Sequence, residues 1–196
     1  MKLLSYFSGI SNSYILGPND GGEAILVDPG KFDVAFLNLI ESNSFDITTV
    51  LVTHSHERHI RGLKILKKIY HARIISGDKE LGDFEFEIAE AGSRIEASGI
   101  GIETLCLADQ LTRSRIFRIG NFLFTGNLLS AGRVEGSIEK RALLIDSIKE
   151  KILAIPEELL ILPSCGPPST ISAELRWNPN FHPRHQAYST EENALQ

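Results

Sequence analysis

Short apolar runs separated by turn residues make up most of the first half of the chain. They predict strands over residues 2–7, 12–17, 23–27 and 47–53, with the turn sequence Asn19-Asp20-Gly21-Gly22 before the third. Apolar residues at helical spacing predict one helix over about 32–42 and another from about Ile60 to Tyr70. The segment between these two helices therefore predicts a strand that leads directly into a helix.

The second half continues with short strands and one longer helix. Residues 72–76 predict a strand, residues 84–88 alternate as a half-buried strand does, and residues 95–105 predict two or three more. Gly120-Asn121 between the runs 114–119 and 122–125 is typical of a hairpin. A helix over 138–152 and a strand over 159–162 follow. This order predicts an α/β sandwich, with two sheets covered by helices on the outside.

The bulk properties narrow the class of protein. A length of 196 residues predicts one domain, assigned to residues 1–181, because residues 182–196 are polar, aperiodic and typical of a flexible tail. The net charge of −5 argues against a nucleic-acid partner. Apolar runs stay short of the ~20 residues that a membrane helix needs, so no membrane partner is expected. Cys106 and Cys165 are too few for a disulfide framework, so we expect a cytoplasmic protein.

Three histidines follow the apolar run that ends at Thr53. His54, His56 and His59 lie within six residues, at the junction between a predicted strand and a predicted helix. Neutral imidazole is the commonest metal ligand in proteins, and residues two apart on a strand face the same side. We therefore expect these three side chains to be metal ligands, with zinc the most suitable ion.

The Thr53–His59 stretch resembles the signature of the metallo-β-lactamase superfamily, Thr-His-x-His-x-Asp-His. Further segments resemble the glyoxalase II-like branch in the same order along the chain, namely 23–30, 124–127, 144–152 and 163–171. The resemblance covers about residues 10–180 and implies an αββα fold, a sandwich of two mixed β-sheets flanked by helices. It also implies metal-assisted hydrolysis at a centre of two ions.

Four of the seven ligand positions that the resemblance implies carry other residues. His54, His56 and His59 match the family pattern, and the departures are Arg58 for Asp, Gln110 for His, Asn127 for the bridging Asp and Cys165 for the last His. Guanidinium is always charged and has no acceptor atom, and a neutral amide offers only a weak oxygen dipole. At about 4 Å and an effective dielectric near 20, unit charges repel by ~4 kcal/mol, and a dication doubles that. A centre of two ions is therefore not expected.

Two interpretations remain open. In the first, the chain is a non-hydrolytic ligand-binding or regulatory pseudoenzyme that binds a small anionic molecule through Arg58 and Asn127, without metal. In the second, it is a mononuclear hydrolase of a thioester or ester, with one divalent ion on His54 and His56 and with His59, Gln110 or Cys165 completing the set. Arg113 and Arg115 could face the mouth of the anion site, and Cys165 could also be a small buried residue or a nucleophile. Trp177 is expected to be a packing anchor.

Overall fold

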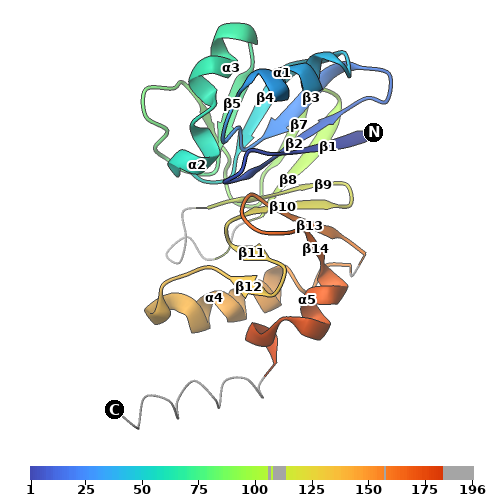
Figure 1. Cartoon of the computed structure of the whole chain (residues 1–196). Helices are drawn as coiled ribbons and strands as arrows, with labels where there is room; N and C mark the ends of the chain where they lie inside the picture. Colours follow the sequence, from blue (N-terminus) through green and yellow to red (C-terminus); the bar gives the residue numbers. More distant parts are fainter. Residues whose placement is uncertain (106, 108–113, 157, 183–196) are drawn as a thin grey trace.

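The protein consists of four layers, helices, sheet, sheet and helices, in the computed structural model (Figure 1). The structure describes residues 1–105, 107, 114–156 and 158–182. Gln110, Cys106 and the predicted tail from residue 183 onward lie outside these residues. The αββα arrangement that the sequence predicts is confirmed, since each of the two large sheets mixes parallel and antiparallel strands.

The first sheet has the order β1-β2-β3-β4-β5-β6. Its first three strands pair antiparallel, and β3, β4, β5 and β6 pair parallel. Helices α1, α2 and α3 lie on its outer side (Figure 1). The bounds are β1 Lys2–Phe7, β2 Asn12–Gly17, β3 Gly22–Val27, α1 Val34–Glu41, β4 Phe45–Val52, α2 Glu57–Ile60, α3 Leu63–Ile69, β5 Arg73–Ser76 and β6 Glu87–Ile88.

The second sheet has the order β14-β13-β10-β9-β8-β7, with β10 and β13 parallel. Helices α4 and α5 cover its outer side, and the small ribbon of β11 and β12 lies between them and the sheet (Figure 1). The bounds are β7 Arg94–Ala97, β8 Ile100–Leu105, β9 Ile116–Ile119, β10 Phe122–Gly126, β11 Leu129–Ser130, β12 Arg133–Val134, α4 Ile138–Lys151, β13 Leu160–Pro163, β14 Ser169–Thr170, α5 Ile171–Trp177 and the 3₁₀ turn η1 Pro179–Phe181.

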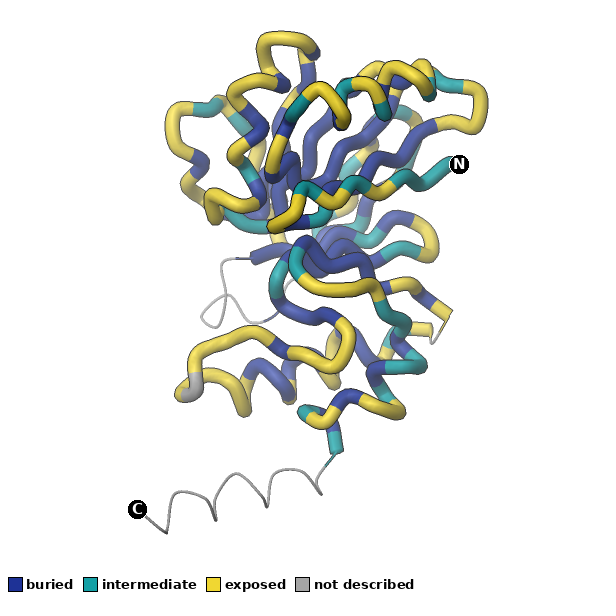
Figure 2. Tube along the Cα trace, viewed as in Figure 1, coloured by how far each residue is buried: buried dark blue, intermediate teal, exposed yellow. Residues whose placement is uncertain are grey.

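Side chains alternate between separate apolar cores along each central strand. In β2, Ile15 faces the core under the outer helices, whereas Tyr14 and Leu16 face the core between the two sheets. A third core lies between the second sheet and α4 and α5. Figure 2 shows the buried residues concentrated in the two sheets, with exposed residues along the outer helices. Strands buried on both faces read as continuous apolar runs, and this explains the run that precedes the histidines.

The predicted helix from Ile60 to Tyr70 differs from the structure, which has two short helices. The first begins at Glu57, so His59 lies on α2 rather than in a turn. The break falls at Gly62, whose backbone N–H donates to the carbonyl of Pro29 at 2.8 Å. A Cβ at this position would lie 2.5 Å from that carbonyl oxygen, so the close approach needs glycine. A long-range contact thus decides where the helix breaks.

Several other predictions require correction. The predicted strand over 84–88 is reduced to β6, because Phe84 and Phe86 pack against the core under the outer helices instead. The elements β11, β12, β14 and α5 were not predicted, since each is too short to show a period. The prediction that Trp177 is a packing anchor is wrong, because its side chain is 78% exposed at the end of α5. No described helix has the length and apolarity needed to cross a membrane.

Candidate functional site

The candidate site lies where the parallel strands of both sheets end. Asp28 follows β3, Thr53 follows β4 and Asp78 comes two residues after β5, so all three reach the same edge of the first sheet. Asn127 and Ser164 follow β10 and β13, which are parallel in the second sheet. Residues far apart in the sequence therefore meet at one edge of the sandwich, as ligand sites of parallel sheets generally do.

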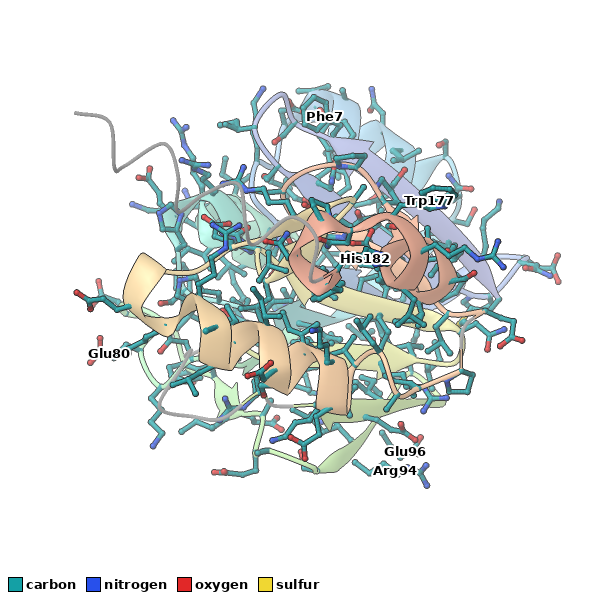
Figure 3. All side chains as sticks on the ribbon, turned by 90° about the horizontal axis from the view of Figure 1, so that it is seen from below. Phe7, Glu80, Arg94, Glu96, Trp177 and His182 are labelled. Carbon is teal, nitrogen blue, oxygen red and sulfur yellow. The ribbon has the colours of Figure 1, made fainter. Side chains whose placement is uncertain are left out.

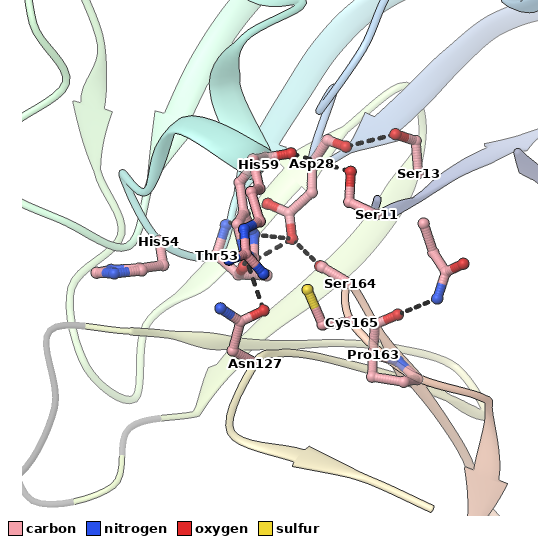
Figure 4. A network of polar contacts seen from close by, with 12 residues as sticks. Ser11, Ser13, Asp28, Thr53, His54, His59, Asn127, Pro163, Ser164 and Cys165 are labelled. Carbon is pink, nitrogen blue, oxygen red and sulfur yellow. Dashed lines mark hydrogen bonds and ion pairs between the residues drawn. The ribbon is translucent and has the colours of Figure 1, made fainter. Parts of the chain in front are cut away.

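Asp28 is the centre of a buried network of hydrogen bonds (Figure 4). Its Oδ1 accepts from the backbone N–H of Thr53 at 2.8 Å, and its Oδ2 accepts from the Thr53 hydroxyl at 2.7 Å. The hydroxyl of Ser164 also donates to Oδ2, and this contact joins the two sheets. Desolvation by itself would raise the pKa of Asp28, but the charge of His59 and these hydrogen bonds hold the pKa below its usual value. Asp28 is therefore a buried carboxylate.

His59 is fully buried and has both ring nitrogens engaged. Nδ1 lies 2.9 Å from Oδ2 of Asp28, and Nε2 lies 3.0 Å from Oδ1 of Asn127. Where Oδ1 of Asn127 is the partner, both ring nitrogens donate and the ring is protonated. Burial by itself would lower the pKa of His59, but the Asp28 carboxylate and both hydrogen bonds raise it above the usual value. If the Asn127 amide turns to offer Nδ2, Nε2 accepts from it and is still engaged.

His54 points away from this network (Figure 4) and has a carboxylate of its own. Its Nδ1 lies 3.4 Å from Oδ2 of Asp78, which is buried and also accepts from the Ser55 hydroxyl at 2.6 Å. Burial, followed by the charge of His59, lowers the pKa of His54, so the neutral ring is favoured. The contact does not form a hydrogen bond, but a carboxylate on the Nδ1 side favours the tautomer that leaves the Nε2 lone pair available.

His56 and Arg58 line a cavity of about 430 Å³ together with His54. The ring centroids of His54, His56 and His59 lie 6.2–6.4 Å from one another, with the rings of His54 and His56 nearly parallel, and metal binding by these three stays a prediction. Arg58 is exposed, and its side chain makes no ion pair with any described residue. The remaining wall of the cavity is formed by Ser114, Asn127, Leu128, Glu135, Gly136, Ser137, Lys140 and Leu144.

Cys165 lies on a smaller cavity of about 190 Å³, which shares Asn127 and Glu135 with the larger one. The side chain is half-buried, and its Sγ is 4.0 Å from the carbonyl oxygen of Ile10. It is therefore not the fully buried small residue considered above. The prediction that Arg115 faces the mouth of the anion site is wrong, because this side chain is buried and its Nε donates to the carbonyl of Ala89. Gln110 and Arg113 lie outside the described residues.

The sequence contained a signal for the site residues that were missed in the first sheet. Asp28 and Asp78 each follow an apolar strand that neighbours β4, and the carboxyl ends of parallel strands meet at one edge. In the sequence by itself, Asp28-Pro29-Gly30 indicates only a turn. Ser164, Glu135 and Lys140 had no comparable signal, because their placement depends on how the second sheet and α4 pack.

A glycine opposite Arg58 gives the first testable prediction. A Cβ on Gly30 would overlap the backbone carbonyl oxygen of Arg58 and the hydroxyl of Ser11, which donates to that same carbonyl at 3.0 Å. We expect Gly30→Ala to lower the free energy of unfolding by about 1–3 kcal/mol, as overpacking does. Urea denaturation measures this, with Gly101→Ala as the control, since that Cβ meets only the end of a Glu96 side chain. Equal stability of the two variants would contradict the close approach.

Comparisons with known proteins agree with this fold and this site. The sequence model of the metallo-beta-lactamase superfamily matches residues 7–96, which include the histidine cluster. A hydroxyacylglutathione hydrolase of Haemophilus ducreyi is 26% identical over 169 residues, covering 84% of this chain and 70% of that protein. An uncharacterized protein of Treponema pallidum is 28% identical over 158 residues, covering 81% and 85%. The resemblance to the superfamily and to its glyoxalase II-like enzymes is confirmed.

Solved structures extend the likeness to the whole fold. The crystal structure of ETHE1 from Myxococcus xanthus has a TM-score of 0.79 and 21% identity, covering 100% of this chain and 92% of that one. Another similar structure, with a TM-score of 0.72 and 20% identity, is of a protein in a di-iron-bound form, and covers 91% and 99%. At these identities the structures establish the shared fold.

Proposed function

We propose that this protein, which has the metallo-β-lactamase fold, binds a small anionic molecule without hydrolysing it. Arg58 and Asn127 contact the ligand in the 430 Å³ cavity beside the histidines. The observation that carries the proposal is the state of His59, whose two ring nitrogens are both hydrogen-bonded, to Asp28 and to Asn127. While both nitrogens are hydrogen-bonded in this way, neither is open to a metal ion.

The donor set at the second metal position does not fit a cation. The position that the family pattern gives to an aspartate carries Arg58, a fixed positive charge, and the bridging carboxylate is replaced by the amide of Asn127. When His59 is protonated, the buried carboxylate of Asp28 balances its charge. These substitutions replace the charge of an ion by the charges of side chains, and they support a site that binds anions rather than a second metal.

The cavity itself supports an anionic ligand. Arg58 offers planar N–H donors that suit a carboxylate or phosphate, and no described acidic side chain neutralises it. Lys140 lies on the same wall and adds positive charge, whereas Glu135 is the acidic residue of the lining. Leu128 and Leu144 give the cavity an apolar part. A small organic acid or phosphate ester matches this combination of charge and apolar surface.

A second candidate function, a mononuclear metal-dependent hydrolase, is supported by His54. Metal-binding histidines usually donate their other ring N–H to a carboxylate, and Nδ1 of His54 lies close to Asp78. His54 and His56, which line the cavity, would hold the ion, with His59, Gln110 or Cys165 completing the set. A bound divalent ion lowers the pKa of water and polarises a carbonyl. The hydroxyacylglutathione hydrolase relatives suggest a thioester substrate. A cytoplasmic location stays a prediction from the small number of cysteines.

The experiment that separates the two functions measures metal content and anion binding on the same preparation. After growth with zinc, iron and manganese, we expect mass spectrometry to find well below one equivalent of metal. Isothermal titration with inorganic phosphate should detect binding that Arg58→Ala weakens at least about tenfold, as expected for loss of a charge-assisted hydrogen bond. Arg61→Ala is the matched control, because Arg61 is exposed on the same segment but does not line the cavity.

Two results would contradict this proposal. One equivalent of metal that is lost in His54→Ala would favour the mononuclear hydrolase and justify assays with thioesters and esters. Phosphate binding that is the same in Arg58→Ala and in Arg61→Ala would remove Arg58 from the ligand site.

A further inference from the structure

The segment that carries α2 and α3 is densely basic. Residues 58–73 hold six of the 20 Lys and Arg residues and no Asp or Glu, in a chain whose net charge is −5. Two of these cations are used within the molecule, since Lys67 donates to the carbonyl of Ala72 and Arg73 pairs with Glu87. Among the described residues, Arg61, Lys64 and Lys68 make no such contact. Their charge is therefore presented to the outside.

Helical spacing places these three cations beside two exposed isoleucines. Arg61, Lys64 and Lys68 lie on the side opposite the buried residues of α3, and Ile65 and Ile69 lie on the same outward side. The isoleucines are 48% and 45% exposed. In Figure 2 the tube along α3 is coloured mainly as exposed. The two isoleucines give this charged surface an apolar part that a partner would cover.

An acidic segment lies next to this basic one. The connection from β5 to β6 passes beside α2 and α3 (Figure 1), and its Leu81 is buried in the same core as Leu63 and Leu66 of α3. Its exposed charged residues, together with those of β6, are Lys79, Glu80, Asp83, Glu85 and Glu87. Glu80 projects at the edge of the molecule (Figure 3).

Asp83 and Glu85 are the free acids of this segment, because neither has an ionic partner among the described residues. The exposed edge strand β6 adds an apolar group, since its Ile88 is 42% exposed. The outer face of the first sheet therefore has a basic half with two isoleucines and an acidic half with one.

We propose that this face, formed by α3 and residues 79–88, is the interface of a homodimer with two-fold symmetry. A face that carries a positive and a negative half side by side is complementary to itself after a two-fold rotation, because each half meets the opposite half of the other copy. Lys64 and Lys68 of one copy then face Asp83 and Glu85 of the other, and the exposed isoleucines are covered. The contact between the two copies would also cover the unpaired edge of β6.

Sedimentation velocity with two charge-reversed variants tests this proposal. We expect the wild-type protein to dimerise at micromolar concentration and to dissociate as salt is raised, since surface charges are screened. The variant Lys64→Glu/Lys68→Glu and the variant Asp83→Lys/Glu85→Lys should each weaken the dimer at least about tenfold, because like charges then oppose each other. All four residues are exposed, and circular dichroism checks that both variants fold.

The decisive measurement is a mixture of the two variants. In the mixed pair, the acidic α3 of one copy meets the basic positions 83 and 85 of the other. The basic α3 of that second copy meets the acidic positions 83 and 85 of the first, so the mixture should restore the dimer. Each variant alone should stay monomeric. A third variant, Glu139→Lys/Glu150→Lys on the exposed surface of α4, is the control and should leave the dimer unchanged.

Two outcomes would overturn the dimer. The first is a wild-type protein that is monomeric at every concentration tested, and the second is a mixture that stays monomeric although both variants fold. In the first case, co-sedimentation with vesicles containing anionic phospholipid would assign the basic half to a membrane surface. The residues tested lie outside the cavity, so phosphate binding should be the same in all variants. A protein that does not bind phosphate would contradict the proposed function and leave the dimer untouched.

Discussion

Asp28→Asn should remove about 3–5 kcal/mol from the free energy of unfolding, the range found when one partner of a buried ion pair is deleted. The carboxylate of Asp28 accepts from Thr53, His59 and Ser164, and an amide cannot accept all of these contacts. The change also leaves the His59 ring without its counter-charge. Asn is the appropriate replacement because Asp28 has a φ of 49°, a conformation that Asn tolerates.

Urea denaturation followed by circular dichroism measures this loss, and the midpoint should fall while the dependence on urea stays unchanged. Asp146→Asn is the matched control, since Asp146 is exposed on α4 and has no ionic partner among the described residues. It should change the stability by less than about 0.5 kcal/mol. A similarly small effect of Asp28→Asn would mean that the network does not hold the two sheets together.

Restoring the four ligands that the family pattern implies should convert the protein into one that binds about two zinc ions. The variant combines Arg58→Asp, Gln110→His, Asn127→Asp and Cys165→His, and it keeps His54, His56 and His59. With Asn127→Asp, a carboxylate replaces the amide at Nε2 of His59, and with Arg58→Asp the fixed positive charge is removed. Apparent binding free energies of structural zinc reach about 10–16 kcal/mol, so the expected change in metal content is large.

Metal content by mass spectrometry, before and after dialysis against zinc, gives the stoichiometry. The control is the same variant with His56→Ala, which should bind fewer ions although its fold is unchanged. Circular dichroism establishes that each variant is folded. A folded variant that binds no zinc would show that these four positions do not converge as the family pattern implies.

The sequence by itself determined the order of most of the larger elements and hence the class of fold. The continuous apolar run before Thr53 predicted β4, the Gly120-Asn121 pair predicted the hairpin of β9 and β10, and the spacing over 138–152 predicted α4. These signals are local, because strand and helix periods are set by backbone geometry within a few residues. The resemblance at Thr53–His59 was local in the same sense, and it identified the edge of the sandwich at which the site lies.

The tertiary structure decided what that site is. The bond from Ser164 to Asp28 joins residues 136 positions apart, and the bond from His59 to Asn127 joins residues 68 positions apart. No period or motif encodes such contacts, since they exist only after the two sheets have packed. The same holds for the break at Gly62, which is set by the carbonyl of Pro29. The sequence thus determined that histidines lie at this edge, whereas packing determined that His59 bonds to Asp28 and Asn127.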